Sequence, residues 1–236
     1  MISTYSNVHR SFLQACSLHG TLTVPDATKI MVHLFGRYQP DDTIPDERRL
    51  QELIDQINPK LSRYQQKIVL LESDPKLPNY VVFANLSDSP LNRLQTTYPA
   101  GELSFFRVVL HELAATQGHK LEQIEWLNLT AKIEEGRNVT KSRAEELLTE
   151  WVSAGYLVLD EDGIGFGPKT QVEFDRYLLN NFPDQVEQCR LCKEVLFYGI
   201  KCAKCPVSMH KTCAKKYFKK VKNCPACKKP WTVALD

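Results

Sequence analysis

Apolar and polar residues in the middle of the chain follow first a helical period and then a strand period. Apolar side chains recur three and four positions apart over residues 103–113, and a second helical stretch is expected over residues 121–133. A third helix is expected to begin at a capping box of Ser142 and Glu145 and to end at Gly155. Three consecutive helices are therefore predicted for this region.

A β-hairpin is predicted directly after these helices. Residues 156–159 and 164–167 flank the sequence Asp160-Glu161-Asp162-Gly163, whose acidic residues and glycine favour a tight turn. A last helix is expected over residues 172–179. Three helices followed by a hairpin is the element order of a winged helix, which we predict for residues 100–182.

The N-terminal region predicts a similar and longer unit. Helical periodicity is expected over three stretches, residues 8–18, 27–38 and 46–61. Residues 69–71 and 80–83 are apolar and are expected to pair as strands across a turn between Pro75 and Pro78. We therefore expect a winged-helix-like domain over residues 1–95.

The third helix of the 100–182 unit has an exposed face that would not attract DNA. Its charged residues are Lys141, Arg143, Glu145, Glu146 and Glu150, which are three acids against two bases. A phosphate backbone is bound by an excess of positive charge. We therefore expect this winged helix to dock proteins rather than DNA.

Composition places the chain among ordinary globular proteins. Of its 236 residues, 43% are hydrophobic and 25% are charged, so packed cores are expected. No apolar run approaches the roughly 20 residues that span a bilayer, and the first residues lack the pattern of a secretory signal. We expect a soluble intracellular protein with no membrane contact.

Charge is divided unevenly along the chain. Residues 189–236 contain 12 Lys and Arg against 2 Asp and Glu, whereas residues 1–188 contain 18 against 26. The formal net charge of +2 hides this asymmetry. The two regions are therefore expected to have different physical roles.

Cysteine is concentrated in the basic C-terminal region. Seven of the eight cysteines lie between residues 189 and 227, and Cys16 stands alone as an expected small buried apolar residue. In a reducing compartment such a cluster binds metal instead of forming disulfides. Four pairs of ligands, each with two residues between the partners, are Cys189 and Cys192, Cys202 and Cys205, His210 and Cys213, and Cys224 and Cys227.

Eight Cys and His ligands predict two closed structural zinc sites. Zinc prefers four nitrogen or sulfur ligands in a tetrahedron, and thiolates together with imidazole favour zinc over hard cations. His210 must bind as the neutral ring, and its other nitrogen is expected to find a hydrogen-bond partner. Because the residues from 189 onward offer few core candidates, this domain needs the metal to fold.

The ligand order Cys-Cys-Cys-Cys-His-Cys-Cys-Cys is typical of PHD fingers and of RING variants, and both interleave their pairs. One ion is then held by Cys189, Cys192, His210 and Cys213, and the other by Cys202, Cys205, Cys224 and Cys227. PHD fingers usually carry Trp two residues before the seventh ligand, where this chain has Lys222. A RING-like domain therefore fits better than a PHD-type histone reader.

Residues that contact ubiquitin-conjugating enzymes in RING domains have counterparts in this chain. Leu191 stands between the first two ligands, Tyr217 follows the sixth ligand by four residues, and Pro225 directly follows the seventh. Lys228 occupies the position after the eighth ligand, where active RINGs often prefer Arg. The chain also departs from ordinary RINGs because its fourth and fifth ligands are Cys and His, not His and Cys.

The combined pattern predicts an α+β chain with two tandem winged-helix-like domains followed by a small cross-brace two-zinc RING-like domain. The RING-like domain is expected over residues 183–236. Residues 87–99 are expected to link the two winged helices, and residues 183–188 to lead into the zinc ligands.

This arrangement resembles the non-SMC element one family, the RING-like subunit of the SMC five–six chromosome-maintenance complex. The resemblance covers the whole chain. Its most specific part is the zinc pattern, which includes Cys224-Pro225-Ala226-Cys227 and the stretch Phe197-Tyr198-Gly199-Ile200. The winged-helix match is one of architecture.

The family resemblance implies a nuclear protein of DNA repair. It implies docking of the winged helices onto a MAGE-like subunit, with a kleisin subunit and the SMC ATPases in the same complex. It also implies a ubiquitin ligase that the MAGE-like partner stimulates. In this interpretation Leu191, Tyr217 and Pro225 contact a ubiquitin-conjugating enzyme. Lys228 helps to hold ubiquitin, and no covalent intermediate forms because the reactive thiols bind zinc.

The alternative from another functional class is a non-catalytic interaction module. Its RING-like domain would be structural and would bind only proteins or DNA. Five lysines interleaved with aromatic residues would then contact DNA phosphates: Lys215, Lys216, Lys219, Lys220 and Lys222. Ubiquitin transfer and salt-dependent DNA binding are the measurements that separate the two functions.

Overall fold

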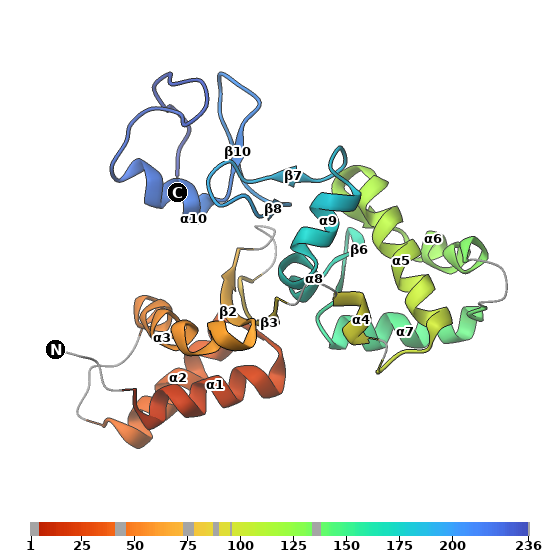
Figure 1. Ribbon diagram of the computed structural model, residues 1–236, viewed down its shortest axis with the longest axis horizontal. Coiled ribbons are helices and arrows are strands. Elements are labelled where there is room, and N and C mark those ends of the chain that lie inside the picture. Colours follow the sequence, from red (N-terminus) through yellow and green to blue (C-terminus); the bar gives the residue numbers. More distant parts are fainter. Residues whose placement is uncertain are drawn as a thin grey trace.

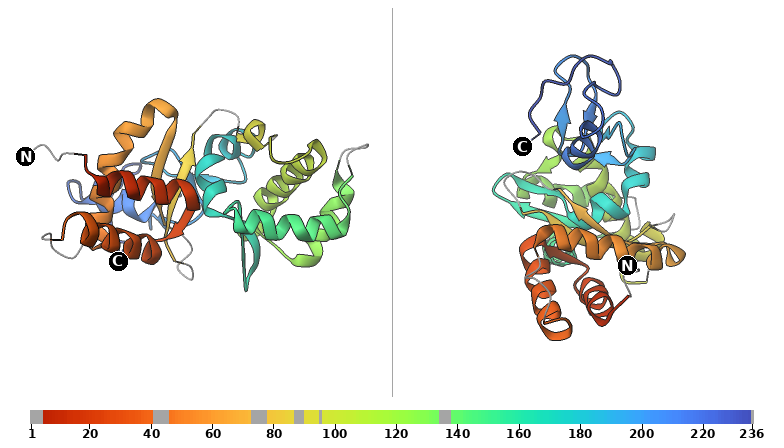
Figure 2. Two further views of the ribbon diagram at one scale, coloured as in Figure 1. Left: turned by 90° about the horizontal axis from the view of Figure 1, so that it is seen from below. Right: turned by 90° about the vertical axis from the view of Figure 1, so that its left-hand side faces the viewer.

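Three lobes follow one another along the chain in a computed structural model that describes residues 5–40, 46–72, 78–86, 90–94, 96–133 and 138–235. Figure 1 shows a red-to-orange N-terminal lobe, a yellow-to-cyan middle lobe and a blue C-terminal lobe. The N-terminal and C-terminal lobes lie on the same side of the middle lobe in Figures 1 and 2. No helix among the described residues combines the length and the apolar character needed to cross a bilayer.

The N-terminal lobe has the winged-helix order of helix, strand, two helices and two strands. Its elements are α1 (Asn7–His19), β1 (Thr21–Thr23), α2 (Val24–Tyr38), α3 (Glu47–Leu61), the 3-10 turn η1 (Ser62–Tyr64), β2 (Gln66–Leu71) and β3 (Tyr80–Asn85). The antiparallel sheet has the order β1-β3-β2. Helices α2 and α3 begin where the side chains of Thr23 and Asp46 accept hydrogen bonds from first-turn amides.

The core of this lobe contains apolar side chains from its three helices and its sheet. Phe12, Met31 and Ile54 come from α1, α2 and α3 and are buried together with Ile68 of β2. Cys16 belongs to the same core, and burial raises the pKa of its thiol to about 12. The prediction that Cys16 is a small buried apolar residue is confirmed.

The middle lobe is a second winged helix with additional short helices. Its elements are α4 (Pro90–Leu94), α5 (Ala100–Ala115), η2 (Gln117–His119), β4 (Lys120–Leu121), α6 (Gln123–Asn128), η3 (Leu129–Lys132), α7 (Lys141–Ser153), β5 (Leu157–Asp160), β6 (Gly163–Phe166), α8 (Pro168–Glu173) and α9 (Asp175–Asn181). Its antiparallel sheet has the order β4-β6-β5. Trp126, Trp151 and Phe106 fill the core between the helices and the sheet.

Both predicted hairpins are confirmed by the strand register. Val69 pairs with Val82 in the first winged helix, and Leu157 pairs with Phe166 in the second. Gly155 ends α7 as predicted, with a φ of 80° that an L side chain rarely adopts. Residues 75–77 of the predicted Pro75–Pro78 turn lie outside the described residues.

The start of α7 differs from the prediction. Its cap is Thr140, whose hydroxyl accepts a hydrogen bond from the Arg143 amide at 3.2 Å. The predicted capping box of Ser142 and Glu145 is wrong, because both residues lie inside the helix. Three polar residues with cap propensity stand close together here, so the pattern alone placed the cap two residues too late.

Two predicted helices are interrupted. The stretch 121–133 begins as a strand, because Leu121 pairs with Ile164 in the sheet, and it continues as α6 and η3. The last helix, predicted over 172–179, is divided at Phe174 into α8 and α9. Phe174 is fully buried, so tertiary packing determines the break.

Helix α4 occupies the segment that the sequence predicted as a linker. Its Leu91 and Leu94 are buried in the core of the middle lobe. Residues 87–89 and 95 of the predicted linker lie outside the described residues. The described part of this segment is therefore packed structure and not an open connection.

The two winged helices contact each other through β3 and α8. The Asn85 amide donates a hydrogen bond to the buried carboxylate of Glu173 at 2.9 Å. Gly155 lies directly against β1, since a β carbon placed on it would be 2.6 Å from Thr21 Oγ1. The two lobes can approach this closely only because residue 155 has no side chain.

The C-terminal lobe contains two short hairpins and one helix. Its elements are β7 (Glu187–Gln188), β8 (Val195–Leu196), β9 (Ile200–Lys201), β10 (Ser208–Met209) and α10 (Lys211–Phe218). Strand β7 pairs with β8, and β9 pairs with β10. Phe197 packs against Phe166 of the middle lobe with ring centroids 4.8 Å apart, and Val195 is buried in the middle-lobe core.

We predict that Gly155→Ala destabilises the chain by about 1–3 kcal/mol, because the new β carbon would meet Thr21 and the backbone would be strained at positive φ. The measurement is the free energy of unfolding from a urea titration. Gly36→Ala is the matched control, since Gly36 lies in α2 with no heavy atom within 4 Å of the added β carbon. This control is expected to stabilise the chain by roughly 0.5–1 kcal/mol. Equal effects of both substitutions would contradict the close contact between the lobes.

Candidate metal centre

The eight predicted ligands gather into two groups of four in the C-terminal lobe. The first site contains Cys189, Cys192, His210 and Cys213, and the second site contains Cys202, Cys205, Cys224 and Cys227. In each group the ligand atoms all lie within 4.8 Å of one another. The predicted interleaving is confirmed, because each site combines ligand pairs that are separated along the chain by the other site's pair.

Sulfur separations in the second site fit a zinc tetrahedron. The Sγ atoms of Cys205 and Cys224 are 3.7 Å apart, and those of Cys202 and Cys227 are 3.9 Å apart. Four sulfurs at about 2.3 Å from one zinc ion lie about 3.8 Å from each other, whereas a disulfide needs about 2.05 Å. The residues present therefore fit a structural zinc ion at this position.

His210 faces the first site with its Nδ1 atom. Nδ1 lies 3.3 Å from Cys192 Sγ and 3.9 Å from Cys213 Sγ. Nε2 lies on the other side of the ring, 3.0 Å from the backbone carbonyl of Val195, to which its N–H donates. Nδ1 is therefore the metal ligand, and the expected partner of the second ring nitrogen is the Val195 carbonyl.

The first and last cysteine pairs sit in tight turns of the same form. The amide of Lys193 donates to the Cys189 carbonyl at 3.0 Å, and the amide of Lys228 donates to the Cys224 carbonyl at 3.1 Å. Both lysines have left-handed backbones, with φ values of 67° and 60°. Sequence analysis missed this feature because Gly or Asn usually marks such a position, and here the only signal is the location directly after the second cysteine.

The predicted contacts for a conjugating enzyme lie on elements that the zinc ligands hold. Leu191 stands in the first cysteine turn, half-buried against the small core that contains Leu196 and Met209. Pro225 is half-buried in the last cysteine turn, and its carbonyl accepts a hydrogen bond from Lys228 Nζ at 3.2 Å.

Tyr217 stands on α10, the helix that begins directly after ligand His210 and contains ligand Cys213. Its ring packs edge-on against Phe218 with centroids 5.1 Å apart, and Phe218 packs on Trp231 at 4.6 Å. The position of Tyr217 therefore depends on the first zinc site and on this aromatic cluster.

The five lysines of the predicted DNA contact are all exposed. Lys215 and Lys216 lie in the last turn of α10, where positive charge favours the helix C-terminus, and the others follow directly: Lys219, Lys220 and Lys222. They form one basic segment at the surface of the C-terminal lobe.

Arg143 on the exposed face of α7 forms ion pairs with three glutamates. Arg143 donates to Glu102 at 2.8 Å, to Glu150 at 2.7 Å and to Glu146 at 2.9 Å. These hydrogen bonds, first of all the one to Glu102, raise the pKa of the Arg143 guanidinium. Arg143 is thus already surrounded by carboxylates, which fits the expectation that this helix does not bind a phosphate backbone.

We predict that paired cysteine substitutions will separate interleaved from sequential zinc sites. Cys192→Ala with Cys213→Ala removes two ligands of one site, so the purified chain should retain one zinc ion. Cys192→Ala with Cys205→Ala removes one ligand from each site and should retain none. Zinc per chain is measured by atomic emission and by native mass spectrometry, with Cys16→Ala as the control that keeps two ions. The reverse result for the two double variants would establish sequential sites.

Comparisons with known proteins agree with this geometry. The family model described as the Nse1 non-SMC component of the SMC5-6 complex matches residues 9–174, and a RING-like domain model matches residues 189–227. The non-structural maintenance of chromosomes element 1 homolog of Drosophila melanogaster is 28% identical over 97% of each chain. The Homo sapiens protein of the same name is 27% identical over 96% of this chain and 84% of its own.

A solved structure shares the fold of the chain. It is titled Nse1-Nse3-Nse4 complex and matches with a TM-score of 0.69 and 21% identity, covering 97% of this chain and 98% of the solved chain. Because the family model covers both winged helices and a RING-like model covers the zinc ligands, the chain belongs to the Nse1 family of non-SMC components of the SMC5-6 complex.

Proposed function

We propose that this chain is the RING-type ubiquitin ligase subunit of an SMC5-6 complex. The observation that carries the proposal is the pair of interleaved zinc sites. Their ligands fix the positions of the segments that contain Leu191, Tyr217 and Pro225. These side chains are the ones expected to receive a ubiquitin-conjugating enzyme. The family to which the chain belongs supports the same assignment.

The proposed reaction forms no covalent intermediate on this chain. Seven cysteines would serve as zinc ligands, and Cys16 is buried with a raised pKa, so none of them would act as a nucleophile at neutral pH. The chain acts by orienting the thioester between ubiquitin and the conjugating enzyme, which lowers the entropic part of the barrier. Lys228 contributes a single cationic contact to ubiquitin, weaker than the planar fork of Arg.

The proposed assembly follows from the relatives. The solved neighbour is named as a complex of Nse1, Nse3 and Nse4, which supports binding of a MAGE-like subunit and a kleisin subunit by this chain. We place the chain with the SMC ATPases, in the nucleus, in DNA repair. The winged helices are the proposed docking region, and the N-terminal one has a groove lined by the highly exposed Leu18 and Tyr64, which suits a protein partner better than DNA.

We predict that Leu191→Glu abolishes ubiquitin-chain formation and leaves two zinc ions per chain. A charge placed in the contact with the conjugating enzyme costs roughly 2 kcal/mol or more, so activity should fall at least about 30-fold. The assay uses zinc-loaded chain with a panel of conjugating enzymes, with and without a MAGE-like subunit. Leu159→Glu is the matched control in the assay without the MAGE-like subunit, because Leu159 is an exposed leucine of the middle lobe.

The zinc content decides how the result is interpreted. Loss of chains together with loss of zinc would mean that Leu191 serves the fold and not the contact. Chains that persist in the zinc-loaded Leu191→Glu variant would refute the proposed contact. Absence of chains from the wild-type protein under all conditions, with two zinc ions bound, would favour the non-catalytic module.

The basic segment of the C-terminal lobe favours a second candidate function, contact with DNA. Its five lysines are all exposed. Residues 189–236 as a whole contain only 2 Asp and Glu against 12 Lys and Arg, so this positive charge is not balanced within the lobe. We predict that changing all five to Glu lowers the affinity for duplex DNA and flattens its dependence on salt, since each lost phosphate contact removes about one unit of the slope. Fluorescence anisotropy from low to high salt measures both quantities. An unchanged slope would show that these lysines are only a solvated face.

A further inference from the structure

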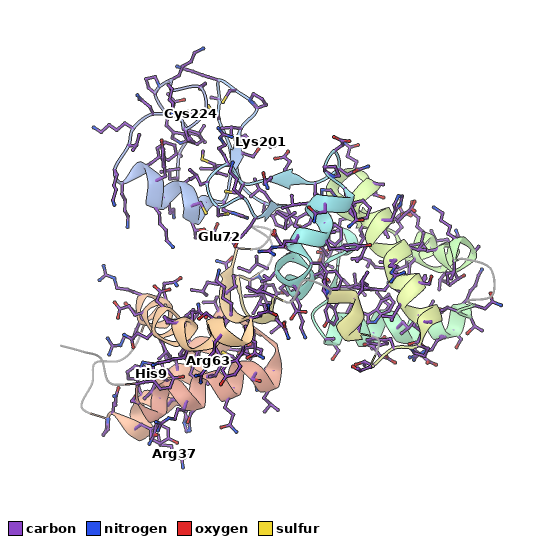
Figure 3. All side chains as sticks on the ribbon, in the orientation of Figure 1. His9, Arg37, Arg63, Glu72, Lys201 and Cys224 are labelled. Atoms are coloured by element: carbon purple, nitrogen blue, oxygen red, sulfur yellow. The ribbon has the colours of Figure 1, made fainter. Side chains whose placement is uncertain are left out.

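Two carboxylates from outside the C-terminal lobe reach the backbone around the first zinc site. One is Asp175 at the start of α9 in the middle lobe, and the other is Glu72, directly after β2 in the N-terminal lobe. Figure 3 shows Glu72 at the edge of the N-terminal lobe nearest the C-terminal lobe. Neither residue belongs to the zinc ligands or to the contacts predicted for ubiquitin transfer.

Asp175 is connected to the ligand His210 through a single residue. Its Oδ1 accepts a hydrogen bond from the amide of Val195, and the carbonyl of Val195 accepts the Nε2–H of His210 at 3.0 Å. Both the amide and the carbonyl of the buried Val195 therefore have hydrogen-bond partners. The Val195 carbonyl determines the orientation of the His210 ring. Because Asp175 holds Val195 in place, the middle lobe influences this orientation through Asp175.

Glu72 acts on the other element of the first site. Its Oε2 accepts a hydrogen bond from the Thr212 amide at 3.1 Å. Thr212 lies between the ligands His210 and Cys213 in the first turn of α10, where amides have no partner within the helix. A carboxylate at this end also interacts favourably with the helix dipole. The N-terminal lobe therefore holds the helix that carries Cys213.

The second zinc site is stabilised from within the C-terminal lobe. Cys202 Sγ accepts a hydrogen bond from the Lys204 amide at 3.4 Å, and the Cys224 amide donates to the Lys229 carbonyl at 2.9 Å. Figure 3 shows Cys224 at the part of this lobe away from Glu72 and the N-terminal lobe. The two metal sites thus differ in their connection to the rest of the molecule.

We propose that Asp175 and Glu72 are positioning residues that form a carboxylate clasp, through which both winged helices hold the ligands of the first zinc site. The clasp makes this site the slower of the two to release its ion. The proposal concerns metal binding, and it stands whether or not the domain transfers ubiquitin.

The test measures zinc release from the full zinc-loaded chain with a chromogenic chelator. The wild-type chain is expected to release zinc in two phases. The double variant Cys192→Ala with Cys213→Ala, which keeps only the second site, should show the fast phase alone. Asp175→Ala and Glu72→Ala should each accelerate the slow phase by about tenfold, the lower end of what a lost partner of a metal ligand costs, and leave the fast phase unchanged.

Two further variants separate the hydrogen bond from general effects. Asp175→Asn keeps an oxygen that accepts the Val195 amide and should release zinc at close to the wild-type rate. Asp184→Ala removes an exposed carboxylate between α9 and β7 and should change neither phase. Slow-phase acceleration by Asp184→Ala equal to that by Asp175→Ala would overturn the proposal, since loss of negative charge alone would then explain the effect.

Substitution with Co²⁺ identifies the site that responds. The first site has one nitrogen and three sulfur ligands and the second has four sulfurs, so their ligand-field bands differ. Asp175→Ala should alter the bands of the site with nitrogen and leave those of the all-sulfur site in place. An unchanged slow phase in both Ala variants, or equal acceleration of both phases, would overturn the clasp, because neither outcome is specific to the first site.

Discussion

Coordination of two zinc ions by interleaved ligand pairs is the constraint on which the C-terminal lobe depends. The buried core of this lobe contains Leu196, Met209 and Ala214 besides the ligand Cys189. Ordering a residue costs about 1–2 kcal/mol of backbone entropy, which so small a core cannot offset. Structural zinc contributes roughly 10–16 kcal/mol in small fingers. Because each ion joins ligand pairs that are distant along the chain, each zinc site orders more than one segment of the lobe.

Much of this architecture was predictable because its signals are local in sequence. The spacing within each cysteine pair specifies a metal ligand pair, and the apolar periodicity of α5 and the turn before Gly163 specify their elements. The ligand order, with Lys222 where PHD fingers usually carry Trp, indicated a RING-like zinc domain, and the family resemblance added the expected partners. Local signals failed where several polar residues competed for one cap, as at Thr140, and where burial of Phe174 divided a helix.

The contacts between lobes were not predictable from the sequence. Glu72 and Thr212 are 140 residues apart, and Asp175 and Val195 are 20 apart. The sequence around a carboxylate that follows a strand does not indicate which backbone amide of another lobe will donate a hydrogen bond to it. The left-handed backbone of Lys193 was missed for a related reason, because the turn geometry imposed by the metal overrides the residue's own preference.

The packing of Phe197 on Phe166 has a consequence for how the chain can be divided. Phe197 and Val195 complete the apolar core of the middle lobe, so one hydrophobic interior extends across the predicted domain boundary. A fragment cut at residue 183 would leave those side chains in water on one piece and an open cavity on the other. The RING-like domain therefore shares part of its apolar core with the middle lobe, and substitutions in that core act on both lobes.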